Sequence, residues 1–191
     1  MANKVETLTL TLLFILATYS ALSIGTGWDE LSEILRGNQR LKYLFSLGSW
    51  ENYWKEQNDE FYPGFYTTLA SFFTKMFPKK YEFEVWHLIN TIISILTIFG
   101  IYRVSKILFN KKVGKIVFLL CFFNPTFFGH MAINPKDTIV AFANVWTTYF
   151  FIKYLTKQNT KENLNNLLIL SGFALGLGTG VRLPFIITLA P

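Results

Sequence analysis

The sequence predicts an all-helical protein that crosses a membrane about five times, with further interfacial helices in its first extracytoplasmic loop. Of its 191 residues, 51% are hydrophobic and 16% are charged, whereas about 25% of the residues in a soluble domain are charged. Aromatic side chains make up 18% of the chain, a density typical of lipid-facing helices and interfacial belts. Five uncharged stretches, separated by charged connections, provide the candidate spans.

The first candidate span covers residues 7–28, which contain no charged residue. This stretch exceeds the roughly 20 residues that a helix needs to cross the hydrocarbon core. A cleaved signal peptide is the competing interpretation, with Lys4 as its basic region. Glu6 is unfavourable in such a region, and no clear small-residue cleavage site precedes Gly25. We therefore expect an uncleaved membrane helix.

Residues 29–82 form the longest polar interval, and we predict that they are the first extracytoplasmic loop. The interval opens with an amphipathic helix that Gly37-Asn38 is expected to interrupt and Gly48-Ser49 to end. The apolar residues that recur at helical spacing are Leu31, Ile34, Leu35, Leu41, Leu44 and Phe45.

The second half of this loop is aromatic. Residues 50–54 alternate aromatic and polar side chains, a pattern suited to the headgroup interface. After the break at residues 62–64, residues 65–77 are apolar and aromatic, but they are too few to span comfortably. We predict an interfacial or re-entrant helix there.

Four further stretches are candidate spans: residues 85–102, 116–135, 138–152 and 163–181. The stretch 138–152 is short, but Lys153 can direct its ammonium group toward the interface and so lengthen the span. The single cysteine, Cys121, lies inside an apolar run and has no intrachain partner, so we interpret it as a small core or lipid-facing side chain.

Two short basic connections set the predicted orientation. Residues 103–115 carry five basic residues and residues 153–161 carry three, and such loops favour the cytoplasmic side. This orientation places the loop 29–82, the turn 134–137 and Arg182 together on the outer side. The net charge of +6 does not indicate nucleic-acid binding, because the basic residues lie between hydrophobic segments.

Several polar residues converge on that outer side. Taken singly, Asp29 and Glu30 fit the start of a solvated loop, Asp137 fits a helix cap, and His130 fits an interfacial histidine. Arg182 follows an apolar, glycine-rich run, where a cation is costly and calls for a partner or an anionic ligand. Together, a carboxylate could take a proton from an acceptor hydroxyl while cations stabilise a departing phosphate.

The order of these motifs resembles the C-type, multi-spanning membrane glycosyltransferases related to protein O-mannosyltransferases and lipid A aminoarabinose transferases. An acidic pair follows the first membrane helix in that superfamily, as Trp28-Asp29-Glu30 does here. The other matches are an aromatic-proline stretch before the second span (Tyr62-Pro63-Gly64-Phe65-Tyr66), an acidic residue at the fourth helix (Asp137), and a glycine-rich fifth helix ending in a basic residue (Gly172, Gly176, Gly178 and Arg182).

The resemblance implies a GT-C fold and transfer of a sugar from a polyprenyl-phosphate donor to a lipid, glycan or protein acceptor. It implies Asp29 as the acceptor-activating base, with Glu30 and Asp137 in the same acidic site. Arg182, with Lys136, would face the donor phosphate. If the enzyme uses a divalent cation, those three carboxylates would hold it. The expected substrate-binding residues are Tyr62, Tyr66 and His130.

The resemblance has two departures. Tyr62 stands where the aminoarabinose branch has a lysine, so that branch's donor contacts do not transfer. The chain is also shorter than the family's members, so we expect residues 1–191 to be the N-terminal part of a longer enzyme, in a bacterial inner membrane with its site facing the periplasm. A transporter or flippase whose path is lined by Asp137 and Arg182 is the alternative function, and a non-catalytic membrane subunit is a third.

Overall fold

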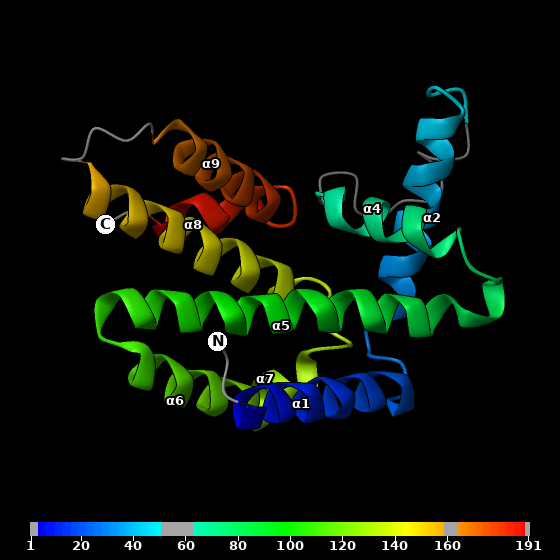
Figure 1. The fold of residues 1–191 in the computed structure, drawn as a ribbon. Coiled ribbons are helices and arrows are strands. Elements are labelled where there is room, and N and C mark those ends of the chain that lie inside the picture. Colours follow the sequence, from blue (N-terminus) through cyan, green and yellow to red (C-terminus); the bar gives the residue numbers. More distant parts are fainter. Residues whose placement is uncertain (1–3, 51–62, 159–163, 190–191) are drawn as a thin grey trace.

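The protein is a bundle of helices arranged around one long central helix, α5 (Figure 1). The computed structural model describes residues 4–50, 63–158 and 164–189, and this part of the chain contains helices and no strand. The all-α prediction is therefore confirmed for these residues. The elements are α1 (Lys4–Ser23), α2 (Glu30–Phe45), α4 (Phe65–Thr74), η1 (Lys79–Tyr81), α5 (Glu82–Leu108), α6 (Lys111–Phe122), α7 (Pro125–His130), α8 (Asp137–Lys157), α9 (Asn165–Thr179) and η2 (Leu183–Leu189).

Helix α5 separates two hydrophobic clusters. On one side, α1, α6 and α7 pack against it around Leu13, Ala17, Ile98, Phe122 and Met131. On the other side, α2, α4 and α8 meet around Ile34, Tyr66, Ala70, Trp86, Ile139 and Val181. Because α5 contributes a buried residue to both clusters, it is the element against which the others are positioned.

The helices alternate in direction, so their ends form two groups (Figure 1). The end of α1, the start of α5 and the start of α8 lie together, beside α2 and α4. The connection between α5 and α6 lies at the opposite end, as does the C-terminal end of α8. The acidic residues predicted to form a site therefore lie at one end, and the basic α5–α6 connection lies at the other.

Two helices in the described residues are long and apolar enough to cross a membrane: α1, with 20 residues, and the 30-residue stretch Lys79–Leu108 that contains α5. Helix α9 is apolar but has only 15 residues. Helix α8 has 21 residues and covers the predicted span 138–152, but it is not one of these two helices, so its crossing stays a prediction.

The predicted span 116–135 is not one helix, which corrects the sequence interpretation. Helix α6 ends at Phe122, and α7 begins at Pro125 after a break. Pro125 has no N–H to donate to a continuing helix, and it is well suited to the first position of a new one. Asn124 caps α7, because its side-chain oxygen accepts a hydrogen bond of 2.9 Å from the backbone N–H of Phe127.

The expected interruption of α2 at Gly37-Asn38 is wrong, because the helix runs without a break from Glu30 to Phe45. Gly37 is needed for packing instead. A Cβ atom on Gly37 would lie 2.4 Å from both the carbonyl oxygen of Thr67 and the hydroxyl oxygen of Ser71. Helix α4 therefore approaches α2 closely at this point, where a side chain would prevent it.

Gly37→Ala should destabilise the fold by about 1–3 kcal/mol, because α4 must move to admit the methyl group. Alanine by itself favours a helix over glycine by about 1 kcal/mol, so a loss of stability would have to come from the clash. Gly172→Ala in α9 is the matched control, since its Cβ would meet nothing within 4 Å. Unfolding in detergent measures both variants. Equal or higher stability for Gly37→Ala would contradict the close contact.

Candidate active site

The two residues of the acidic pair predicted after the first span, Asp29 and Glu30, have different surroundings at the start of α2. Asp29 occupies the N-cap position of α2, and its side chain is exposed and makes no capping hydrogen bond. Glu30, the next residue, is completely buried at 0% exposure. Asp29 can therefore meet a substrate from solvent, whereas Glu30 faces the protein interior.

The Glu30 carboxylate connects the loop before α2 to α5. One oxygen, Oε2, accepts a hydrogen bond of 2.9 Å from the backbone N–H of Gly27. The other, Oε1, lies 2.8 Å from Nε2 of His87, which is 3% exposed. This second contact is close, but it does not meet the geometry of a hydrogen bond. The Nδ1 atom of His87 lies 2.9 Å from the carbonyl oxygen of Ala21 at the end of α1. His87 thus contacts the chain on both sides of the loop that carries Asp29.

A second buried carboxylate, Glu33, lies one helical turn further along α2. Its exposure is 2%, and its Oε1 contacts Nη1 of Arg36 at 2.7 Å and Nζ of Lys136 at 2.8 Å. Lys136 immediately precedes α8, so this ion pair joins the start of α2 to the start of α8. The glycine at position 27 lies against the same segment, since an added Cβ would be 3.1 Å from Ile133.

Asp137 and Arg182 also contact each other at this end of the bundle. Oδ1 of Asp137 lies 2.8 Å from Nη2 of Arg182, and both side chains are about half exposed. Asn134 orients the carboxylate, because its Nδ2 donates to Asp137 Oδ2 at 3.0 Å while its Oδ1 accepts from the Asp137 N–H at 3.0 Å. The prediction that Asp137 and Arg182 lie on the same side of the protein agrees with this contact.

Polar residues of α5 position both loops of the site. Besides His87, Asn90 donates through Nδ2 to the carbonyl oxygen of Ala132 at 2.7 Å, and Ser94 donates to that of Met131 at 3.1 Å. These two carbonyls lie just before the turn that leads to Lys136 and Asp137. His87, Asn90 and Ser94 follow each other at helical spacing, so one face of α5 supports both the Asp29 loop and the Asp137 turn.

Tyr66, a predicted substrate-binding residue, is 5% exposed and donates its hydroxyl proton to Oδ1 of Asn90. Burial, reinforced by the charge of Glu30, raises the pKa of the Tyr66 phenol. The phenol therefore remains a neutral donor to Asn90. Its ring also packs edge-on against Trp86, with 6.0 Å between the ring centroids. In this arrangement Tyr66 supports α5.

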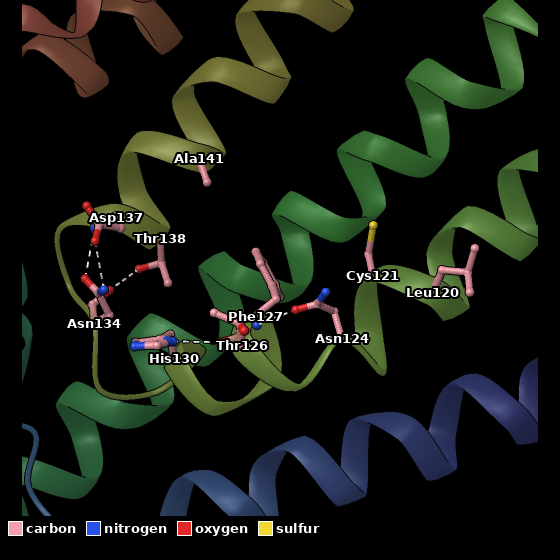
Figure 2. Close-up of a pocket in the computed structure, with 10 residues that line it drawn as sticks. All are labelled: Leu120, Cys121, Asn124, Thr126, Phe127, His130, Asn134, Asp137, Thr138 and Ala141. Atoms are coloured by element: carbon pink, nitrogen blue, oxygen red, sulfur yellow. Dashed lines mark hydrogen bonds between the residues drawn. The ribbon is translucent and has the colours of Figure 1, made fainter.

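A pocket of about 650 Å³ opens beside Asp137, between the end of α6, α7 and the start of α8 (Figure 2). Asn134, Asp137 and Thr138 lie at one end of it, and Leu120 and Cys121 lie at the other. His130 also lines the pocket, and its Nδ1 donates to the carbonyl oxygen of Thr126 at 2.7 Å. Asn124 lies near Leu120 and Cys121, so the end away from the acidic site mixes apolar side chains with one amide.

Apart from Tyr66 and Lys136, described above, the predicted site residues divide into three groups. Asp137 contacts Arg182, and His130 lines the same pocket as Asp137. Asp29 and Glu30 lie at the same end of the bundle, but no contact joins Asp29 to Asp137 among those described. Tyr62 lies outside the residues that the structure describes.

Within the described residues, no three His, Cys, Asp or Glu side chains lie close enough to hold a metal ion. Asp29, Glu30 and Asp137 were named as ligands only in case the enzyme uses a divalent cation, and they are not such a group in this part of the chain.

Sequence analysis missed Glu33, His87 and Asn90. A signal for the last two exists, because polar residues recur every three or four positions within the apolar stretch 85–102. Such a pattern indicates a polar helix face that is buried against other protein elements. No comparable pattern marks Glu33, which lies among other charged residues of α2.

Comparison with known proteins supports the resemblance. Residues 63–191, about two thirds of the chain, match the family described as dolichyl-phosphate-mannose-protein mannosyltransferase. No curated protein and no solved structure gives a match. The matched region contains His87, Lys136, Asp137 and Arg182, and it begins after Asp29. The chain belongs to the dolichyl-phosphate-mannose-protein mannosyltransferase family, a family of membrane-associated glycosyltransferases, as the order of its motifs predicts.

Proposed function

We propose that this protein transfers a sugar from a polyprenyl-phosphate donor to an acceptor at the extracytoplasmic face of a bacterial inner membrane. One observation carries the proposal. A single face of α5 supports the Asp29 loop through His87 and the Asp137 turn through Asn90 and Ser94. An exposed carboxylate and two cations, Lys136 and Arg182, are thereby collected at one end of the bundle.

Asp29 acts as the base in this proposal. Its carboxylate takes the proton of an acceptor hydroxyl as that oxygen forms a bond to the anomeric carbon of the sugar. The bond between this carbon and the donor phosphate oxygen breaks, and the polyprenyl phosphate leaves with the electron pair. Exposure of Asp29 and the absence of a capping bond to its carboxylate support this role.

Arg182 and Lys136 stabilise the negative charge that develops on the departing phosphate. Each has a carboxylate partner, Asp137 and Glu33 respectively. These ion pairs keep the two cations in place before the donor binds. Asp137 therefore acts on the phosphate through Arg182, in addition to lining the pocket.

The pocket of about 650 Å³ is suited to the lipid-linked donor. Its polar end, with Asn134 and Asp137, would receive the sugar, and the donor phosphate would lie toward Arg182, the partner of Asp137. Leu120, Phe127 and Ala141 would contact the first units of the polyprenyl chain. The side chain of His130, whose Nδ1 is occupied by the Thr126 carbonyl, would present Nε2 to a sugar hydroxyl.

The membrane arrangement proposed with this function has five crossings. Helices α1 and α5 are long enough to cross unaided, α8 and α9 add two, and α6 with α7 forms a broken crossing. The basic connection between α5 and α6 then lies in the cytoplasm. The candidate site, at the opposite end, faces outward.

The test uses the full chain in proteoliposomes with polyprenyl-phosphate mannose as donor and a set of lipid, glycan and peptide acceptors. We expect mannose to appear on an acceptor only when both substrates are present. A parallel measurement follows movement of the donor across the bilayer without any acceptor. Movement without transfer would favour a flippase and would overturn the proposal.

Arg182→Gln should lower kcat about a hundredfold, because a cation that stabilises the leaving group is lost. Stability should change little, since the Asp137–Arg182 pair is about half exposed and such pairs contribute little. Arg182→Lys should retain part of the activity, because the charge remains without the bidentate geometry. Lys79→Gln, at an exposed position in η1, is the control. Normal kinetics for Arg182→Gln would rule out a role on the phosphate.

A further inference from the structure

A second cavity lies at the end of the bundle opposite the candidate active site. Its volume is about 300 Å³, and it lies between α1, α5 and α6. Cavities of this size are at the lower limit for small-molecule sites. Most of the side chains that line it are apolar. The lining residues are Val5, Glu6, Thr9, Leu10, Leu13, Phe99, Tyr102, Lys115, Phe118 and Leu119.

The polar edge of this cavity consists mainly of an ion pair between Glu6 and Lys115. Both side chains are partly exposed, at 33% and 42%, so the pair lies where the cavity meets solvent. Lys111 precedes Lys115 by one helical turn and lies on the same face of α6. Arg103 lies over the ring of Phe99, a wall residue, with 5.0 Å from the guanidinium carbon to the ring centroid.

The charge around this opening is strongly positive. Residues 103–115 carry Arg103, Lys106, Lys111, Lys112 and Lys115, and no acidic residue occurs in the sequence between Glu84 and Asp137. Glu6 can balance only one of these cations. The opening therefore attracts an anion, while the walls behind it favour a hydrocarbon chain.

We propose that this cavity binds an anionic phospholipid, with the phosphate near Lys115 and Lys111 and an acyl chain against Leu10, Leu13 and Phe118. Two of the three helices around it, α1 and α5, are those long and apolar enough to cross a membrane, so the cavity opens where a bilayer meets water. Basic pockets between membrane helices bind anionic headgroups in this way. The site is separate from sugar transfer, and it does not depend on which end faces the cytoplasm.

The experiment compares phosphatidylglycerol with phosphatidylcholine of identical acyl chains. The full chain is placed in nanodiscs with equal amounts of both lipids and extracted in mild detergent, and mass spectrometry quantifies the lipid that remains bound. We expect phosphatidylglycerol to be retained at least fivefold over phosphatidylcholine. Lys111→Gln with Lys112→Gln should abolish this preference, since each lysine near the surface contributes about fivefold.

Matched variants separate the two parts of the site. Lys79→Gln with Lys80→Gln removes the same charge at the opposite end and should leave the preference unchanged. Leu10→Trp should fill the cavity and displace the lipid with every charge retained, whereas Leu12→Trp, exposed and outside the cavity, should not.

Equal retention of the two lipids by the unmodified chain would overturn the proposal, as would full preference in the variant lacking Lys111 and Lys112. Excess inorganic phosphate provides a further test. Complete release of phosphatidylglycerol by phosphate, together with no effect of Leu10→Trp, would show a simple anion site and would also overturn it. Sugar-transfer activity is measured on the same samples, so failure of the lipid site is distinguishable from failure of the proposed function.

Discussion

Asp29→Asn is expected to reduce sugar transfer about a thousandfold without loss of stability or membrane insertion. A positioned base contributes roughly 10²- to 10⁴-fold to such a reaction, and the amide cannot accept the proton of the acceptor hydroxyl. Asparagine is as good an N-cap residue as aspartate, and the Asp29 side chain makes no capping bond that the change could break. The start of α2 should therefore remain intact.

Steady-state transfer by the full chain, with donor and acceptor each varied, measures this effect. The loss should appear in kcat, while the KM for the donor should change little, because the donor phosphate is assigned to Arg182 and Lys136. Glu84→Gln is the control carboxylate, since it lies in the first turn of α5 outside the assigned groups. Unreduced transfer by Asp29→Asn would refute the assignment of the base.

His87→Leu is expected to lower the free energy of unfolding by about 3 kcal/mol. The change leaves the fully buried carboxylate of Glu30 without its partner at 2.8 Å, and removal of one member of a buried pair typically costs 3–5 kcal/mol. The contact with the Ala21 carbonyl is lost as well. Transfer should also fall, because the loop carrying Asp29 would no longer be connected to α5.

The double variant Glu30→Gln with His87→Gln tests how much of the lost stability comes from leaving the buried Glu30 carboxylate without its partner. Two neutral amides leave no unpaired charge, so unfolding in detergent should show a smaller loss than for His87→Leu. His130→Gln changes an exposed histidine and should leave stability unaltered. Should His87→Leu unfold like the unmodified chain and transfer normally, the positioning role of His87 would be wrong.

Much of the fold was predictable because hydropathy is a local property. The stretches 85–102, 138–152 and 163–181 coincide with α5, α8 and α9, each an apolar run between charged residues. The basic connection between α5 and α6 lies at the opposite end from the acidic residues because successive helices run in alternating directions. The break between α6 and α7 was also readable, since Asn124-Pro125 marks a helix start.

The site was predictable only in part. Asp29, Asp137 and Arg182 lie at the ends of apolar stretches, so the order of the helices predicts that they share one end of the bundle. The order of the helices does not predict which side chains contact the loops that carry them. His87 meets Ala21 and Glu30 across more than fifty residues of sequence, and Lys136 meets Glu33 across about a hundred. Such contacts depend on how helices pack, which a pattern along one helix does not specify.

Asp29 and Glu30 illustrate this limit at single-residue scale. Sequence alone determines that two carboxylates follow an apolar helix and that a membrane-associated, all-helical protein carries them at one end. Successive residues of a helix point about 100° apart, so the rotation of α2 decides which carboxylate is buried. That rotation depends on tertiary packing: Gly37 admits α4, and Ile34 packs against Tyr66 and Trp86. With α2 held in this position, Glu30 points inward to His87 and Asp29 remains exposed for chemistry.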